Sequence, residues 1–233
     1  MQTPARLAVL FASLLTAAAL IAGCSSDSKS SEALPDATTL LADSNKTTKD
    51  LQSVHLELTT TGEIKELPIA KLTGDLTNTP AVAASGKADI VFLGQKVSDV
   101  EFVVMDGTLF GALTPGSWSD FGPAADIYDV SAILNPNTGL ANVLASFSNG
   151  KTDGRETVNG VETYKVTGDV SADGVNKIAP QIAATGPVPG TAWISTDGKN
   201  DLVQAKLDVT KDSNVQMTMS KWGEPVTVTK PAV

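Results

Sequence analysis

The stretch VSDVEFVVMDG, residues 97–107, shows the pattern that decides the fold. Val100, Phe102 and Val104 stand at every second position, and the stretch ends in the dipeptide Asp106-Gly107. Side chains that recur with a period of two lie on one face of a β-strand, and Asp-Gly is a frequent turn of a β-hairpin. This stretch therefore predicts a strand of an antiparallel sheet with one apolar face, followed by a tight turn.

The same alternation continues on both sides of this stretch. It appears repeatedly between residues 53 and 94 and returns between residues 154 and 230, with further turns at Asn159-Gly160 and Asp197-Gly198. The total is about ten strands. The alternation predicts these inward positions: Val54, Leu56, Leu58, Leu72, Leu76, Ile90, Phe92, Val100, Phe102 and Val104.

Helical spacing replaces the alternation in a few places. Asp36 is the expected N-cap of a first helix, whose apolar side includes Leu40 and Leu51. Further short helices are expected after the fifth strand, over residues 119–150, and again over residues 171–182. The apolar stripes of the middle segment are Ile127, Val130, Ile133 and Leu134, then Leu140, Val143, Leu144 and Phe147.

These elements predict an α+β fold in which one strongly curved antiparallel sheet, a half-barrel of about ten strands, packs on a few helices. A sheet of this size curls or splits. Its concave face has more area than two or three short helices cover, and the remainder needs loops, a partner or a ligand. An aliphatic face is also what an ordinary core requires, so the pattern alone leaves packing and ligand binding open.

The N-terminus reads as a secretory leader followed by an anchor. Residues 1–23 contain one Arg and an uncharged stretch rich in Leu and Ala, which is typical of a signal peptide. The sequence IAGC then places small residues before Cys24, the only cysteine in the chain. It resembles the lipobox of bacterial lipoproteins, in which this thiol is acylated. The alternative is a free cysteine beside an ordinary cleavage site.

This interpretation divides the chain into three parts: a leader (1–23), a lipidated cysteine with a polar tether (24–35), and one domain (36–233). Acyl chains on Cys24 would hold the protein at the plasma membrane, facing the periplasm and cell wall. The formal net charge is −9, so nucleic acid is not an expected partner.

The residue types that catalysis needs are nearly absent from the sequence. The chain has one histidine, His55, at a polar position of a predicted strand, and no G-x-S-x-G motif surrounds a serine. One His and one acylated Cys do not make a zinc site, and no nucleotide-binding motif occurs. Asp126 and Asp129 are expected on a solvated helix face. The sequence therefore predicts no catalytic residues, no metal and no cofactor.

Several long strings carry a resemblance to a known family: WSDFGPAADIYD (118–129), LNPNTGLANVLASF (134–147), VNKIAP (175–180) and VQMTMSKWGEPVTVTKPAV (215–233). They resemble the mycobacterial LppX/LprG group of lipoproteins, and the similarity extends over the whole chain. The resemblance implies a deep apolar cavity between the sheet and the helices, lined by the inward positions named above.

The resemblance also implies the biological role. It is that of a carrier for triacylated glycolipids (phosphatidylinositol mannosides, lipomannan, lipoarabinomannan) and for triacylglycerol, which it moves toward the outer envelope. Expected partners are a major-facilitator transporter and, through the palmitate-type acyl groups of the lipoprotein, host Toll-like receptor 2. Two alternatives stay open: an envelope adaptor that docks a transporter or cell-wall enzyme, and a lipid esterase that uses His55.

Overall fold

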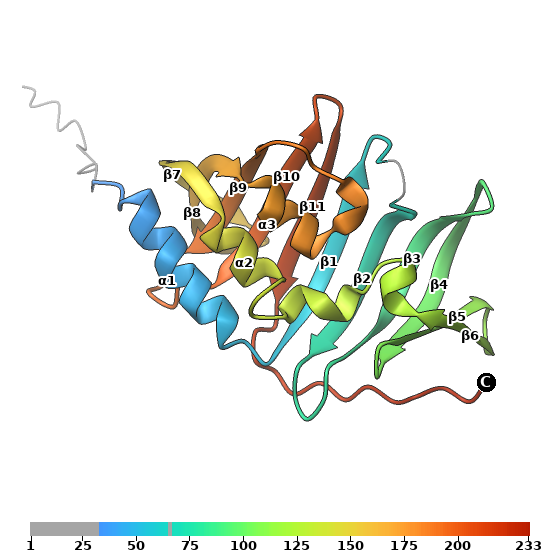
Figure 1. The fold of residues 1–233 in the computed structure, drawn as a ribbon. Coiled ribbons are helices and arrows are strands. Elements are labelled where there is room, and N and C mark those ends of the chain that lie inside the picture. Colours follow the sequence, from blue (N-terminus) through green and yellow to red (C-terminus); the bar gives the residue numbers. More distant parts are fainter. Residues whose placement is uncertain (1–32, 65–66) are drawn as a thin grey trace, which may run out of the picture. The chain divides into compact units, whose positions relative to one another are not determined.

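The computed structural model describes residues 33–64 and 67–233 (Figure 1). Helix α1 (Ala37–Lys49) begins where the sequence predicts, because the Asp36 carboxylate accepts a hydrogen bond of 2.9 Å from the backbone N–H of Thr39. The helix ends at Lys49, so Leu51, which was expected on its apolar side, lies in the segment after it.

One antiparallel sheet of eleven strands follows, in the order β6-β5-β4-β3-β2-β1-β11-β10-β9-β8-β7. The predicted antiparallel α+β architecture is confirmed, with one strand more than expected. Strands that follow one another along the chain pair with each other, except β6 and β7, which are the two edges of the sheet. The pairing of β1 with β11 joins the two arms. The strands are β1 Ser53–Thr61, β2 Ile69–Thr77, β3 Ala83–Phe92, β4 Gln95–Met105, β5 Thr108–Thr114, β6 Ser117–Pro123, β7 Phe147–Val158, β8 Val161–Val170, β9 Val188–Ser195, β10 Leu202–Thr210 and β11 Ser213–Ser220.

The helical layer lies over one face of this sheet (Figure 1). The middle helical segment follows the sixth strand rather than the fifth, and Phe147, which was expected on a helical stripe, opens β7. The segment with helical spacing around residues 124–134 forms two 3₁₀ turns, because Asp129 caps Ser131 locally and no long helix propagates. The elements are η1 Ala124–Asp126, η2 Val130–Leu134, α2 Leu140–Ala145, α3 Ala172–Ile178 and η3 Pro180–Ile182.

A row of small residues crosses the concave face of the sheet in its N-terminal arm. Gly74 of β2 pairs with Gly86 of β3, and Gly86 pairs with Phe102 of β4. A Cβ on Gly86 would stand 2.1 Å from the carbonyl oxygen of Thr73, and a Cβ on Gly74 would stand 3.2 Å from the Phe102 ring. Glycine is therefore required here, because the strands approach each other more closely than a side chain allows and the Phe102 ring lies over the space that results.

This close approach predicts a stability difference between two glycine substitutions. Gly86→Ala should lower the free energy of unfolding by about 1–3 kcal/mol, because the new methyl group meets backbone atoms that cannot turn away. Gly186→Ala is the matched control, since nothing lies within 4 Å of a Cβ there. Urea denaturation of both variants measures the difference, and equal stability of the two would refute the role given to the glycine pair.

The C-terminal segment, residues 223–233, extends from the end of β11 past the N-terminal arm of the sheet (Figure 1). The backbone N–H of Gly223 donates to the carbonyl of Ser53 at 2.9 Å, and the Ser53 hydroxyl donates to the carbonyl of Glu224 at 2.6 Å. Farther along, the Lys230 ammonium lies 5.1 Å from the centre of the Phe110 ring. The segment therefore helps to cover apolar side chains that β5 presents on the face opposite the helices.

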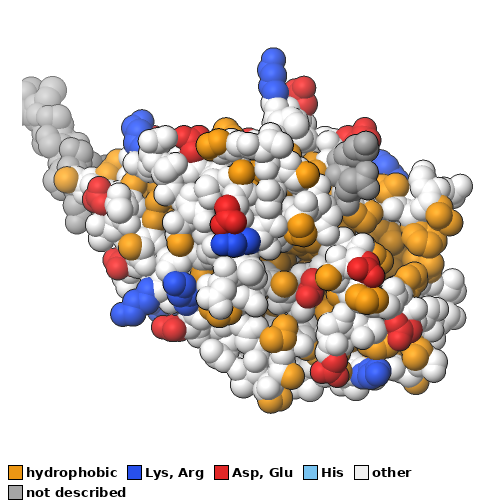
Figure 2. All heavy atoms as spheres, viewed as in Figure 1, with side chains coloured by type: hydrophobic (Ala, Val, Ile, Leu, Met, Phe, Trp, Pro, Cys, Tyr) orange, Lys and Arg blue, Asp and Glu red, His pale blue; other side chains and the backbone are white. Residues whose placement is uncertain are grey.

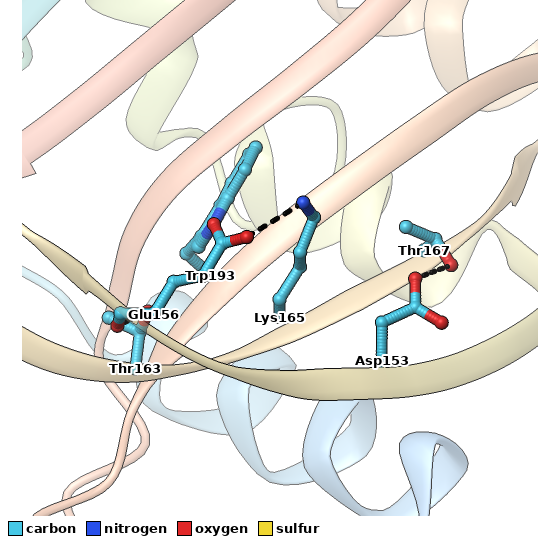
Figure 3. Close-up of polar contacts among 6 residues, drawn as sticks. All are labelled: Asp153, Glu156, Thr163, Lys165, Thr167 and Trp193. Carbon is cyan, nitrogen blue, oxygen red and sulfur yellow. Dashed lines mark hydrogen bonds and ion pairs between the residues drawn. The ribbon is translucent and has the colours of Figure 1, made fainter.

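A polar cluster holds the C-terminal arm together on the same face (Figure 3). The Glu156 carboxylate of β7 accepts from the Lys165 ammonium at 2.9 Å and from the indole N–H of Trp193 at 2.6 Å. Lys165 also lies 5.6 Å from the centre of the Trp193 ring. These hydrogen bonds, the one from Lys165 first, hold the pKa of Glu156 below its usual value.

The lowered pKa of Glu156 predicts an acid-dependent contribution to stability. Its carboxylate stabilises the fold above the unfolded-state pKa of about 4.3, and this contribution is lost as the pH falls through the lower pKa of the folded state. At neutral pH, Glu156→Gln should cost less than about 1 kcal/mol, since the group is partly exposed.

The measurement is urea denaturation of wild type and Glu156→Gln at neutral and at acid pH, with exposed Glu162→Gln as the control. The difference between wild type and Glu156→Gln should shrink toward zero in acid. A difference that stays constant with pH would contradict the assignment.

Candidate apolar binding site

A pocket opens where the N-terminal arm of the sheet faces the 3₁₀ turns. Its walls come from β2–β6 and from residues 127–130, and its volume is about 120 Å³, within about 740 Å³ of atom-free space that includes the open mouth. Among the described residues that line it, only Tyr128 carries a polar side-chain atom. Apart from this one hydroxyl the lining offers no hydrogen-bond partner to a ligand, so the pocket suits hydrocarbon.

The mouth of the pocket is also apolar. Val91 and Phe92 at the end of β3 and Leu113 at the end of β5 line it and are 43%, 39% and 39% exposed. Leu93, at the turn beyond, is 88% exposed. Figure 2 shows hydrophobic side chains gathered at this end of the molecule. An apolar rim that continues into an apolar pocket gives a hydrocarbon chain a path from the surface to the interior.

The rim depends on an irregularity that alternation does not reveal. The pairing of β3 with β4 shifts register between Ala88 and Ile90, and the pairing of β2 with β3 shifts between Ile69 and Lys71. A bulge changes the face on which the following side chains stand. As a result Ile90, Val91 and Phe92 all border the pocket, whereas strict alternation places only the first and the third there.

A second, smaller pocket lies deeper, under α2 and α3. Its volume is about 20 Å³, within about 440 Å³ of atom-free space, and its walls include Leu58, Val143 and Met217. Tyr128 lines this pocket as well as the first one. In place of the single deep cavity that the resemblance implies, the described residues form two small apolar pockets, and Tyr128 lines both of them.

Tyr128 itself is unusual because its polar atom is buried without a partner. The residue is 5% exposed, and within the described part of the chain its hydroxyl makes no hydrogen bond. Burial, with a smaller contribution from the charge of Asp129, raises the pKa of this phenol far above its usual value. A buried hydroxyl without a partner costs about 1–3 kcal/mol.

The structure divides the predicted cavity residues into three groups. Leu72, Ile90, Phe92, Val100, Phe102, Ile127 and Val130 line the first pocket, and Leu58, Leu140 and Val143 line the second. Val54, Leu56, Leu76, Val104, Ile133 and Leu134 are almost fully buried in the hydrophobic core, and neither pocket has them in its wall. Leu144 and Phe147 border a separate hollow between α1 and β7. Cys24 lies outside the described residues.

Sequence reasoning did not assign several lining residues of the first pocket, among them Leu109, Leu113, Phe121 and Tyr128. The signal for two of them was present, because Leu109 and Leu113 alternate through the stretch TLFGALT. Nothing in the sequence separates Tyr128 from an ordinary core tyrosine, since the lack of a partner for its hydroxyl depends on the packing around it.

His55 lies on the face of the sheet opposite the pockets. Its Nδ1 is 2.6 Å from the Asp75 carboxylate, and its Nε2 is 3.3 Å from the Thr73 hydroxyl. Strand pairing places Asp75 between His55 and Ser85. A Ser-His-Asp triad needs the histidine between the other two residues, so this order does not form one.

Two further observations concern residues 33–64 and 67–233. None of the helices there has the length and apolarity that crossing a bilayer requires. The same residues contain no cluster of three or more His, Cys, Asp or Glu side chains suited to a metal ion.

The fold and the pockets define a class: an α+β protein with a single curved antiparallel sheet, a thin helical layer and apolar pockets between them. The chain belongs to the LppX_LprAFG lipoprotein family, whose model matches residues 36–228. It is 60% identical to the lipoarabinomannan carrier protein LprG of Mycolicibacterium smegmatis and 51% identical to that of Mycobacterium tuberculosis, over the full length of both chains in each case.

Solved structures agree with this assignment. LprF from Mycobacterium bovis matches with a TM-score of 0.77 at 34% identity, over 86% of this chain and 99% of that one. The lipoprotein LppX from Mycobacterium tuberculosis matches with a TM-score of 0.66 at 30% identity, over 83% of this chain and all of that one. The predicted family and fold are therefore confirmed.

Proposed function

We propose that this protein is a lipid carrier of the cell envelope that binds the acyl chains of a glycolipid in its apolar pockets and catalyses no reaction. The observation that carries the proposal is the first pocket, whose described lining has a single polar side-chain atom and whose rim is apolar. Acyl chains on Cys24 would anchor the carrier at the plasma membrane while the domain, residues 36–233, exchanges its cargo.

The energetics of lipid transfer explain why such a lining is needed. An acyl chain of about 16 carbons that leaves a membrane for water loses about 12 kcal/mol, at about 0.8 kcal/mol per methylene. A carrier must supply an equivalent dry surface for each chain. Smooth aliphatic walls suit this task, because they accept a flexible chain in many conformations, whereas a sugar headgroup remains in water at the mouth.

The structure fits an unloaded, closed state of such a carrier. The first pocket is below the roughly 300–1,000 Å³ of ordinary ligand sites. Two or three acyl chains need more room, so loading requires the 3₁₀ turns and short helices to move away from the sheet. These elements are short and make few contacts with the N-terminal arm, which makes them the segment that can open at the lowest cost.

The names of the relatives indicate the class of cargo. Two full-length relatives at 60% and 51% identity are named lipoarabinomannan carriers, so the proposed ligands are phosphatidylinositol mannosides, lipomannan and lipoarabinomannan, with triacylglycerol as a further candidate. The proposal includes a major-facilitator transporter as a partner in the membrane. It also includes recognition of the acylated N-terminus by host Toll-like receptor 2. Both partners rest on the resemblance alone.

One observation favours a second candidate function. The closed volume of about 120 Å³ is also what a vestigial pocket would have, in an adaptor that docks a transporter or a cell-wall enzyme through its acidic surface. The two candidates differ in whether function depends on an open pocket.

Filling the pocket distinguishes these candidates. Ile90→Trp places an indole at the wall of the first pocket, and Val82→Trp is the control, at a 50% exposed position away from it. A tryptophan at Val104, another predicted cavity position, would not test the pocket, because Val104 lies fully buried in the core. Both variants are made in the full-length chain with Cys24→Ser and purified from the native host.

Native mass spectrometry should show a bound lipid with two or three acyl chains in the parent protein and in Val82→Trp. The bound fraction should fall about tenfold in Ile90→Trp, because the indole occupies the space of the chain. Lipid-free parent protein that takes up no added phosphatidylinositol mannoside would refute the carrier and favour the adaptor.

The esterase alternative predicts that His55 is essential. We expect His55→Gln to leave lipid binding unchanged, since the residue is on the opposite face of the sheet from the pockets. Hydrolysis of a triacylglycerol emulsion by wild type and by His55→Gln should equal the rate of a heat-denatured sample. Turnover in the wild type that disappears in the variant would overturn the non-catalytic assignment.

A further inference from the structure

We infer that Tyr128 recognises the ester group of the bound lipid: its hydroxyl donates a hydrogen bond to an ester carbonyl oxygen, with one acyl chain in the pocket on each side of the ring. This inference rests on the proposed carrier function and adds a chemical requirement to it. The ligand would be a lipid whose chains are joined to its backbone by esters.

The position of Tyr128 is the first argument. It is the one aromatic residue that lines both pockets, the larger one under β2–β6 and the deeper one under α2 and α3. In a diacylglycerol unit the two ester groups lie where the two chains meet. A ligand with one chain in each pocket would therefore bring an ester close to this ring.

The unpartnered hydroxyl is the second argument. Within the described residues, three buried side-chain polar atoms lack a hydrogen bond: the Ser44 hydroxyl, the Tyr128 hydroxyl and the side-chain oxygen of Gln181. Of these three residues, only Tyr128 lines either pocket. Buried polar groups in folded proteins are nearly always paired, so an unpaired donor in the wall of a ligand site indicates an acceptor on the ligand.

The third argument is that the Tyr128 phenol can act as a hydrogen-bond donor. Burial keeps the phenol protonated throughout the pH range in which proteins fold, so it is available as a donor. The rest of the described lining is hydrocarbon and provides no competing acceptor side chain. An acyl chain has no acceptor along its length, which leaves the ester carbonyl as the matching group on a lipid.

Paired lipids that differ only at this group test the inference. The probes are dipalmitoyl phosphatidylinositol and its dihexadecyl ether analogue, which keeps the head and chain length but lacks both carbonyls. The proteins are the full-length chain with Cys24→Ser, alone and with Tyr128→Phe added. Tyr164→Phe is the matched control, because Tyr164 is the other tyrosine of the chain and its exposed hydroxyl accepts from Arg155 at 3.3 Å.

Dissociation constants are measured by titration in native mass spectrometry. The parent protein and Tyr164→Phe should bind the ester lipid about three- to tenfold more tightly than the ether lipid, which is the effect of one neutral hydrogen bond. Tyr128→Phe should bind both lipids with the affinity of the parent for the ether. Its thermal midpoint should not fall, because the substitution removes a buried hydroxyl that has no partner.

The other outcomes overturn the inference in distinguishable ways. If the parent binds both lipids equally, or if Tyr128→Phe keeps the ester preference, Tyr128 does not recognise an ester, and the carrier function stands. If Tyr128→Phe raises the dissociation constants of both lipids by the same factor, the residue only shapes the pocket. If neither lipid binds the parent, the inference and the carrier function both fail.

Discussion

The close approach of β2 and β3 at Gly74 and Gly86 is the constraint on which the wall of the first pocket depends. Because neither residue has a Cβ, the strands come together on the concave face and the Phe102 ring lies across them. The same ring forms part of the wall of the first pocket. The glycine pair therefore makes room for a ring that shapes the pocket, and a methyl group at either glycine would disturb this packing.

The two arms of the sheet are covered to different extents. The C-terminal arm, with β1, faces α1, α2 and α3; most of its inward side chains are buried in the core, and the smaller second pocket lies there. In the part of the chain that the structure describes, short 3₁₀ turns cover the N-terminal arm, and the first pocket opens there. An apolar face without enough helix above it is unfavourable in a structural protein, whereas in a lipid-binding protein the ligand completes the core.

Membership of the LppX_LprAFG lipoprotein family and the geometry of the pockets support the same function from independent directions. The family likeness supports the class of cargo and the anchor. The pockets add what a name does not supply: a small apolar volume, a rim of hydrophobic side chains, and one buried hydroxyl in the wall of both pockets.

The sequence by itself determined the elements of this protein. Alternation placed the strands, Asp36 marked the start of α1, and Asp106-Gly107 and Asn159-Gly160 marked hairpin turns that the structure confirms at positive φ. These signals are local, because a strand's period and a turn's dihedral angles depend on adjacent residues.

Tertiary structure alone decided which apolar residues form the site. Leu56 and Leu72 stand at equivalent positions of the alternating pattern, yet Leu56 lies in the hydrophobic core and Leu72 lines a pocket. The difference arises because both side chains are on the same face of the sheet but different segments cover them. The unpaired hydroxyl of Tyr128 likewise depends on the packing around it, and the bulge after Ala88 depends on how β3 pairs with β4, which alternation within one strand does not reveal.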